Sequence, residues 1–157
     1  METAHQYRVV AWWTSGRTGI AKSDSAPNAI HFAAPPQFGG MEGRWTPEDL
    51  LMSALASCFT TTFHAIATSS KFEYTDLAVE AEGTVSKCDS GYCFREIVIR
   101  PSLTIPSEER RERALQLLEK SEGLCLVARV FVTAPKLEAR IEIGKKAKAA
   151  DRNVHVH

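Results

Sequence analysis

The sequence predicts an α+β fold, in which strands are joined as hairpins and two helices stand apart from them. Two segments repeat apolar residues at helical spacing, and several shorter segments alternate apolar and polar residues as strands do. The predicted order is strands, helix, strands, helix and strand, without regular βαβ units. A chain of 157 residues has the size of one ordinary domain. We expect a single domain over residues 1–143 and a charged C-terminal tail over residues 144–157.

The first part of the chain is expected to form short strands. Alternating apolar residues predict a strand at 7–13, and the turn residues at 15–19 predict a hairpin that returns as a strand at 20–22. A further strand fits residues 29–33. The glycine-rich segment 38–43 then predicts a loop.

A long central helix is predicted to follow. Thr46 suits the N-cap, Pro47 suits the first helical position, and acidic residues fill the first turn. Leu51, Leu55, Cys58, Thr62 and Ile66 share one face of this helix, which is expected to run to about Ser69. Cys58 therefore lies on an apolar stripe, where a free cysteine is most often a small buried hydrophobic residue.

The second half predicts a long hairpin, a helix and a last strand. Residues 77–86 alternate as a half-buried strand, residues 88–93 make the turn, and residues 94–105 return as the partner strand. Pro101 indicates a bulge or a sheet edge in that strand. A second helix is expected from Ser107 to a stop at Gly123, followed by Cys125 and a final strand at 137–143.

Composition and charge exclude several classes of protein. Hydrophobic residues make up 44% and charged residues 24%, which is typical of a soluble globular protein. Because 19 basic residues balance 19 acidic ones, no overall field attracts nucleic acid or an anionic membrane. Residues 1–10 contain no apolar run that would predict a signal segment or a membrane span. We expect a cytoplasmic protein without a nucleic-acid or membrane partner.

Cysteine is the residue type that carries candidate chemistry. In a reducing compartment a disulfide is more often catalytic than structural. The chain has four cysteines, namely Cys58, Cys88, Cys93 and Cys125. Cys88 and Cys93 flank a turn and could be half of a zinc site, but a second ligand pair is not evident. We expect no metal and no cofactor, and two thiols close enough to oxidise accidentally remain the alternative. Phosphate-binding loops, HExxH and GxSxG are absent from the sequence.

An ordered set of motifs runs along the chain. Its members are Ser15-Gly16-Arg17-Thr18-Gly19, Phe38-Gly39-Gly40, Thr46-Pro47-Glu48-Asp49-Leu50-Leu51, Ala54-Leu55-Ala56-Ser57-Cys58-Phe59, and Cys125. In these motifs the chain resembles the OsmC/organic hydroperoxide resistance family, from about residue 7 to residue 143. The resemblance implies an OsmC-like fold of antiparallel strands around a long central helix, in an intertwined homodimer. One departure is that Leu126 follows Cys125, where the family often has a proline.

The resemblance also implies a function and a set of site residues. The family's two redox cysteines, arginine and glutamate match Cys58, Cys125, Arg17 and Glu48 by motif position. Arg44 competes with Arg17, since branches of the family supply the arginine from different loops; Arg17 is favoured. The implied activity is a thiol-dependent peroxidase that reduces organic hydroperoxides to alcohols through a Cys58 sulfenic acid and a Cys58–Cys125 disulfide. An external dithiol, with a lipoyl protein as the family's suggestion, would restore the thiols.

A rival interpretation keeps the family and changes the function. The protein could be a non-catalytic OsmC-like redox sensor or a hydrophobic-ligand-binding protein, in which the same cysteines oxidise too slowly to protect a cell. An apolar pocket for an alkyl group could draw on four aromatic residues that are equally compatible with a plain core, namely Phe38, Phe59, Phe63 and Phe131.

The chemistry of thiols and guanidinium groups is consistent with the roles that the resemblance implies, but the distance between Glu48 and Cys58 needs an explanation. A free thiol has a pKa near 8.5, and an adjacent guanidinium can lower it to about 3.5–7.5. A carboxylate such as Glu48 could hold that guanidinium by a forked pair of hydrogen bonds. On one straight helix, however, Glu48 and Cys58 would be separated by roughly 15 Å. Either the helix breaks after Leu51, or Arg17 bridges part of the gap, or two chains contribute to one site.

Overall fold

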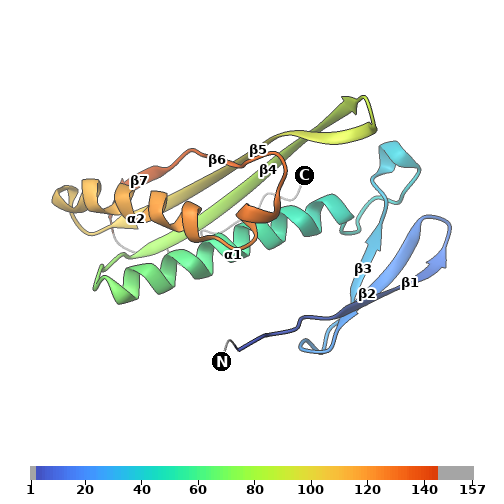
Figure 1. Ribbon diagram of the computed structural model, residues 1–157, viewed down its shortest axis with the longest axis horizontal. Helices are drawn as coiled ribbons and strands as arrows, with labels where there is room; N and C mark the ends of the chain where they lie inside the picture. The colour runs from blue at the N-terminus through green and yellow to red at the C-terminus, as the bar shows by residue number, and fades with distance from the viewer. Residues whose placement is uncertain (1–2, 145–157) are drawn as a thin grey trace. The chain divides into compact units, whose positions relative to one another are not determined.

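The computed structural model describes residues 3–144, and it confirms the predicted α+β fold class (Figure 1). The contacts divide the chain into two compact units, Met1–Leu51 and Met52–His157. Helix α1 (Pro47–Ser69) begins in the first unit and continues in the second. The predicted tail lies outside the described residues except for Gly144, and the extent of a single domain over 1–143 stays a prediction.

The first unit contains a three-stranded antiparallel sheet in the order β1-β2-β3. Its strands are β1 (Val9–Ser15), β2 (Thr18–Ser23) and β3 (Ile30–Ala33). The predicted hairpin is confirmed, with Gly16 at a φ of 51° in its turn, a conformation that glycine adopts without steric cost. A short 3₁₀ helix, η1 (Pro36–Phe38), precedes the segment expected to be loop and overlaps it only at Phe38.

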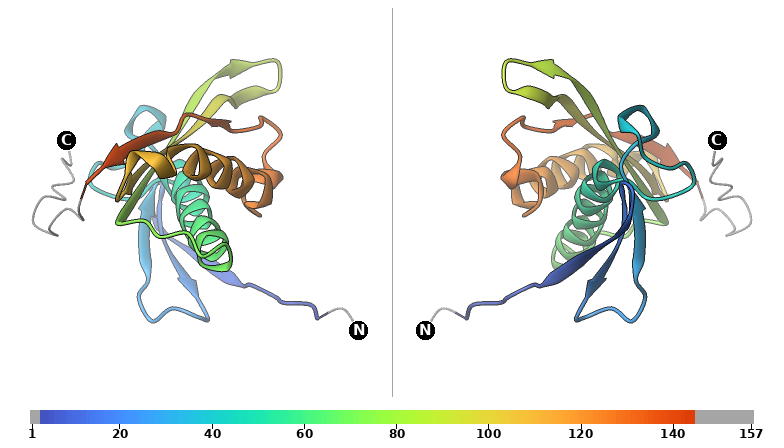
Figure 2. Two further views of the ribbon diagram at one scale, coloured as in Figure 1. Left: turned by 90° about the vertical axis from the view of Figure 1, so that its left-hand side faces the viewer. Right: turned by 90° about the vertical axis from the view of Figure 1, so that its right-hand side faces the viewer.

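The second unit is built on a long antiparallel hairpin of β4 (Asp76–Cys88) and β5 (Gly91–Ile105). Helix α1 and helix α2 (Arg111–Leu124) lie on the same face of this hairpin (Figure 2). Their apolar side chains and those of β5 form one core, which includes Leu55, Phe59, Phe63, Ile66, Ile97, Ile99, Leu103, Ile105, Leu117, Leu118 and Cys125. This packing brings α1 and the end of α2 together.

The final strand differs from its prediction. The structure has two short strands, β6 (Lys136–Leu137) and β7 (Arg140–Ile143), where one strand over 137–143 was expected. Both run parallel to β5, so the sheet is not wholly antiparallel. Alternation in the sequence marks a strand but carries no information on its direction.

Pro101 lies inside β5 opposite Val79, and the predicted bulge at this position is wrong. The register shift falls between Thr84 and Val85 instead. On the other side of β5, the partner strand is interrupted next to Pro101, because β6 pairs with residues up to Ile99 and β7 begins to pair at Ser102. Proline has no N–H to donate, which suits a position between two pairing segments.

The ends of the second helix are also corrected. A 3₁₀ turn, η2 (Glu108–Arg110), precedes α2, and the Ser107 side chain makes no capping hydrogen bond. Gly123 does not stop the helix, since its φ is not positive and α2 continues to Leu124. Cys125 therefore follows the helix directly, in an extended conformation.

The start of α1 agrees with its prediction. Thr46 Oγ1 accepts a hydrogen bond from the Asp49 amide at 3.0 Å, and the Asp49 carboxylate accepts one from the Thr46 amide at 2.9 Å. This reciprocal arrangement satisfies amide groups at the helix N-terminus that have no partner within the helix. The buried face of α1 contains Leu55 and Phe59, and Cys58, next to Phe59 in the sequence, is half-buried.

Helix α1 is also long and apolar enough to cross a membrane by length and composition. A single helix of this kind is weak evidence for a membrane protein, since the core helix of a soluble protein passes the same test. The expectation of no membrane partner stays a prediction.

Candidate active site at Cys58 and Cys125

Two cysteines from distant parts of the sequence meet in the second unit. Cys58 lies in the middle of α1, and Cys125 follows the last residue of α2. Their thiol groups lie near enough to shift each other's pKa, and both are reduced. Cys125 is fully buried in the core, whereas Cys58 is half-buried and more accessible.

Backbone amides of the segment after α2 act on the two thiols. This segment runs into η3 (Ala128–Val130). The amides of Leu126 and Val127 donate to Cys58. The amides of Val127 and Ala128 donate to Cys125. Successive N–H groups that converge in this way form a concave site that favours a negative charge.

The turn is fixed by hydrogen bonds at the end of α2. The Cys125 amide donates to the Ser121 carbonyl at 2.8 Å, and the buried Ser121 hydroxyl donates to the Leu117 carbonyl at 2.7 Å. These contacts leave little freedom for the backbone that carries the amide donors. The donors are therefore in place before any charge develops on sulfur.

The pKa values of the two thiols are shifted in opposite directions. Burial raises the pKa of Cys58, but hydrogen bonds from the Val127 amide, the Cys125 thiol and other donors outweigh it, so the net pKa lies below the usual range. Thr62 is one of those donors, with Oγ1 at 4.0 Å from Cys58 Sγ. Burial raises the pKa of Cys125, and the neighbouring Cys58 raises it further. Cys58 is thus the thiol that more readily becomes a thiolate, while Cys125 stays protonated.

Arg17 lies in the first unit, in the turn between β1 and β2. Its exposed guanidinium donates a hydrogen bond to the Phe38 carbonyl, in the loop that contains Gly39 at a φ of 78°. The competing Arg44 is half-buried. Among residues 3–144, neither arginine forms an ion pair with a carboxylate within 4.0 Å.

Glu48 stands in the first turn of α1 and is half-buried. Its Oε2 atom is buried and has no hydrogen-bond partner within the described part of the chain. A buried carboxylate oxygen without a donor is unusual in a folded protein. Because α1 is continuous through Leu51, the option that the helix breaks there is wrong. A bridging arginine and a site shared by two chains remain.

The aromatic residues considered for an alkyl pocket fall into different environments. Phe59 and Phe63 are fully buried in the core and leave no open surface. Phe131 is partly buried against the same core, and Phe38 belongs to the first unit. Phe59 and Phe63 therefore act as packing residues.

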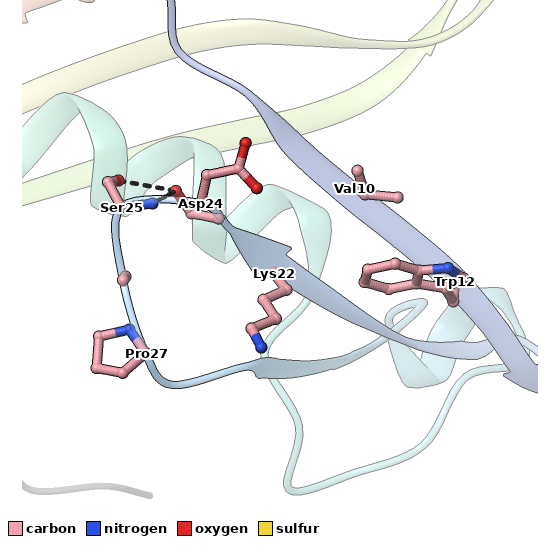
Figure 3. A pocket seen from close by; sticks show the side chains of 8 residues that line it. Val10, Trp12, Lys22, Asp24, Ser25 and Pro27 are labelled. Atoms are coloured by element: carbon pink, nitrogen blue, oxygen red, sulfur yellow. Dashed lines mark hydrogen bonds between the residues drawn. The ribbon is translucent and has the colours of Figure 1, made fainter.

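A pocket of about 560 Å³ in the first unit contains none of the predicted site residues (Figure 3). Its lining residues are Val10, Trp12, Lys22, Ser23, Asp24, Ser25, Ala26 and Pro27. At its rim the Ser25 amide donates to Ser23 Oγ at 3.2 Å. The pocket offers no thiol, so the candidate chemistry stays with the paired cysteines.

Sequence reasoning missed the backbone donors of the site. Leu126, Val127 and Ala128 have apolar side chains and act through backbone N–H groups, which residue type does not reveal. Thr62 carries a weak signal, since it follows Cys58 by one helical turn and so shares its face.

Comparison with known proteins gives a consistent family. An uncharacterized protein of Bacillus subtilis, YmaD, is 25% identical over 89% of this chain and 97% of its own length. The crystal structure of an OsmC-like protein of unknown function from Vibrio cholerae superposes with a TM-score of 0.76 at 18% identity, covering 87% of this chain and 99% of that one. An organic hydroperoxide resistance protein from Elizabethkingia anophelis gives a TM-score of 0.74 at 20% identity, covering 92% and 100%.

A family model described as OsmC-like protein matches residues 40–140. The match contains Glu48, Cys58 and Cys125 together with Arg44, while Arg17 precedes it. Since this range covers well over half of the sequence and the fold agrees, the chain belongs to the OsmC-like protein family.

Proposed function

We propose that the protein is a thiol-dependent peroxidase that reduces organic hydroperoxides to alcohols. The observation that carries this proposal is the contact between a half-buried thiol of lowered pKa, Cys58, and a buried thiol of raised pKa, Cys125. A nucleophilic thiolate beside a protonated resolving thiol is the pair that two-step peroxide reduction needs. The structural neighbour named as an organic hydroperoxide resistance protein supports the same reaction class.

In the first step the Cys58 thiolate attacks the terminal oxygen of the hydroperoxide. The O–O bond breaks, the sulfur becomes a sulfenic acid, and the alkoxide leaves as an alcohol after it takes a proton. The amides of Leu126 and Val127 stabilise the thiolate before the attack. The accessible position of Cys58 suits it to meet the substrate.

In the second step Cys125 attacks the sulfur of the sulfenic acid. A Cys58–Cys125 disulfide forms, and the hydroxyl group leaves as water with the proton of Cys125. One hydroperoxide and two thiols have then become one alcohol, one water and one disulfide. An external dithiol must reduce the disulfide, and a lipoyl protein is the candidate that the family resemblance suggests.

Two further residues belong to the proposal on the family resemblance. Arg17 would place a positive charge at the thiolate and the peroxide oxygen, and Glu48 would anchor its guanidinium. The buried Oε2 of Glu48, which lacks a donor among the described residues, supports a cationic partner for this carboxylate. A homodimer in the cytoplasm completes the proposal.

The test is peroxide consumption by single-cysteine variants in the presence of a dithiol reductant. Cys58→Ser should abolish turnover, because the remaining thiol of this site, Cys125, is buried and has a raised pKa. Cys125→Ser should consume about one equivalent and then stall as a sulfenic acid, which excess peroxide drives to sulfinic acid. Peptide mass mapping of the wild type after one equivalent should find the Cys58–Cys125 bridge, with Cys88 and Cys93 still reduced.

Two results would overturn the assignment. Full turnover by Cys58→Ser would show that Cys58 is not the nucleophile. Very slow consumption by the wild type, with the bridge still formed, would favour a redox sensor instead of an enzyme.

A further inference from the structure

A second pair of thiols stands at the tip of the β4–β5 hairpin. In the register of this hairpin Cys88 lies opposite Gly91, and Cys93 lies opposite Ser86. Side chains alternate between the faces of a strand, so Cys88 and Cys93 point to the same face as diagonal neighbours. The tip stands clear of α2 in Figure 1. These thiols are thus separate from the Cys58 site.

The two thiols lie near each other and remain accessible. The Cys88 and Cys93 side chains are near enough to shift each other's pKa, and both residues are only partly covered. Cys88 Sγ also lies 3.5 Å from Ser90 Oγ. Neither residue belongs to the buried core or packs against it.

The surroundings make the two thiols unequal. The hydrogen bond from Cys93 lowers the pKa of Cys88, and Ser90 and the nearby Arg95 lower it as well. The same bond to Cys88 raises the pKa of Cys93. Arg95 is held close by, since its guanidinium donates to the Lys87 carbonyl at 2.9 Å. Because Ser90 lies beside Cys88 and not beside Cys93, we expect Cys88 to be the nucleophile and Cys93 the resolving thiol.

A metal is a poorer explanation of this pair. Structural zinc takes four ligands, and within residues 3–144 no group of three or more His, Cys, Asp or Glu side chains gathers around a common point. Two sulfur atoms alone do not complete such a site.

We propose that Cys88 and Cys93 form a second redox site, which exchanges electrons with small or exposed disulfides. Cys88 thiolate attacks one sulfur of an external disulfide RSSR and releases one thiolate, which leaves a mixed disulfide on Cys88. Cys93 then attacks the Cys88 sulfur, the second thiolate leaves, and a Cys88–Cys93 disulfide forms. The chain loses two electrons and two protons, and RSSR becomes two RSH.

The hairpin geometry makes this bridge reversible rather than structural. Diagonal neighbours in an antiparallel pair have Cα atoms roughly 7–8 Å apart, whereas a relaxed disulfide requires roughly 4.4–6.8 Å. Closing the bridge therefore works against the strand pairing at the tip. Strained and exposed disulfides are the ones that thiols reduce easily.

The inference does not rest on peroxidase activity, and its test removes the other two cysteines. The full-length Cys58→Ser/Cys125→Ser variant retains only the hairpin thiols, and glutathione disulfide serves as the probe. We expect release of two glutathione molecules per chain and a Cys88–Cys93 bridge in the peptide map, with reversal by excess glutathione. A far-UV spectrum like that of the wild type confirms that the variant is folded.

Two further variants in the same background assign the roles. Replacing Cys93 by Ser should leave one glutathione on Cys88 as a stable adduct, because no resolving thiol remains. Replacing Cys88 by Ser should slow the reaction with the probe, because the remaining thiol has the higher pKa. A stable glutathione adduct on each cysteine, bridges only between chains, or a bridge that excess glutathione does not reduce would each overturn the proposal.

Discussion

At the scale of single residues, four cysteines of identical chemistry occupy four different environments. Cys58 and Cys88 have lowered pKa values, and each stands beside a cysteine whose pKa is raised. The causes differ, because backbone amides act at Cys58 while a neighbouring thiol, Ser90 and Arg95 act at Cys88. The two proposals together assign a hydroperoxide to one pair of unequal thiols and a disulfide to the other.

The hydroxyl of Thr62 offers a mild test of how donors control Cys58. Thr62→Val keeps the shape of the side chain and removes a donor, so the pKa of Cys58 should rise. A weak hydrogen bond contributes roughly 0.5 kcal/mol, which corresponds to about a twofold loss in the rate of peroxide consumption at neutral pH. Because the lost factor is the thiolate fraction, the deficit should disappear at high pH.

Thr61→Val is the matched control for this prediction. Thr61 is exposed on α1, and its hydroxyl donates to the carbonyls of Ser57 and Cys58 rather than to a sulfur. Its pH profile of peroxide consumption should equal that of the wild type. An equal displacement of both profiles would show that the helix, and not the donor to Cys58, was perturbed.

A pair of alanine variants tests whether Arg17 or Arg44 is the arginine that acts on the Cys58 thiolate. Arg17→Ala should raise the pKa of Cys58 and slow peroxide consumption by about tenfold or more, since a pKa change of one unit changes the thiolate fraction about tenfold. Arg44→Ala should have a smaller effect. Thiolate absorbance, titrated in both variants, measures the pKa directly. The opposite ranking would move the role to Arg44.

Part of the site could be predicted from the sequence, and part could not. Cys58 and Cys125 follow from motif position, and the structure brings their thiols together. The amides of Leu126 and Val127 could not be predicted, because backbone N–H groups occur at nearly every residue and only the turn after α2 aims them at sulfur. Motif position alone also does not decide between Arg17 and Arg44.

At the scale of elements, the start of α1 could be predicted from local features of the sequence. The Thr46–Asp49 capping arrangement fixes its start, and its length carries the chain from the first unit into the second. The β4–β5 hairpin could also be predicted, since apolar and polar residues alternate regularly along both strands. Its bulge was not, because an extra residue in one strand leaves no signature in residue type.

The β6 and β7 strands show where prediction from residue alternation is wrong. The alternation over 137–143 suggested one strand, but the two segments pair with separate parts of β5 and run parallel to it. Direction and interruption are set by the connection from α2 and by Pro101 in the neighbouring strand. Both are tertiary effects that a local period of two residues does not encode.

Removal of the helix cap gives a prediction at this scale. Thr46→Ala abolishes the hydrogen bonds between the threonine hydroxyl and Asp49, so the free energy of unfolding should fall by about 1 kcal/mol. Urea unfolding followed by circular dichroism measures this difference. Ser53→Ala, at an exposed interior position of α1, is the control and should leave stability equal or slightly higher, because alanine favours helix. Equal stability of Thr46→Ala and the wild type would contradict the capping role.

At the scale of the whole molecule, several large apolar side chains are exposed on the first unit. All seven residues of β1 are exposed. Among them Trp13 is 76% exposed and Trp12 53%, and Tyr7, which precedes the strand, is 90% exposed. As the first strand in the order of its sheet, β1 also presents unpaired backbone groups along one side. Such a surface is typical of one that a partner covers.

We expect a homodimer in solution, with β1 in the interface. Light scattering should give a mass of twice 17.3 kDa at micromolar concentration. Trp12→Ser removes a large apolar side chain whose burial contributes about 2 kcal/mol, so the dissociation constant of the dimer should rise by roughly 30-fold. Val132→Ser is the matched control, because Val132 is fully exposed in the second unit and its replacement should leave the mass unchanged.

If peroxide turnover needs two chains, dilution of the Trp12→Ser protein should lower its activity per chain, and addition of an inactive Cys58→Ser chain should restore part of it. A mass of 17.3 kDa with full activity per chain at every concentration would remove both the dimer and the shared site.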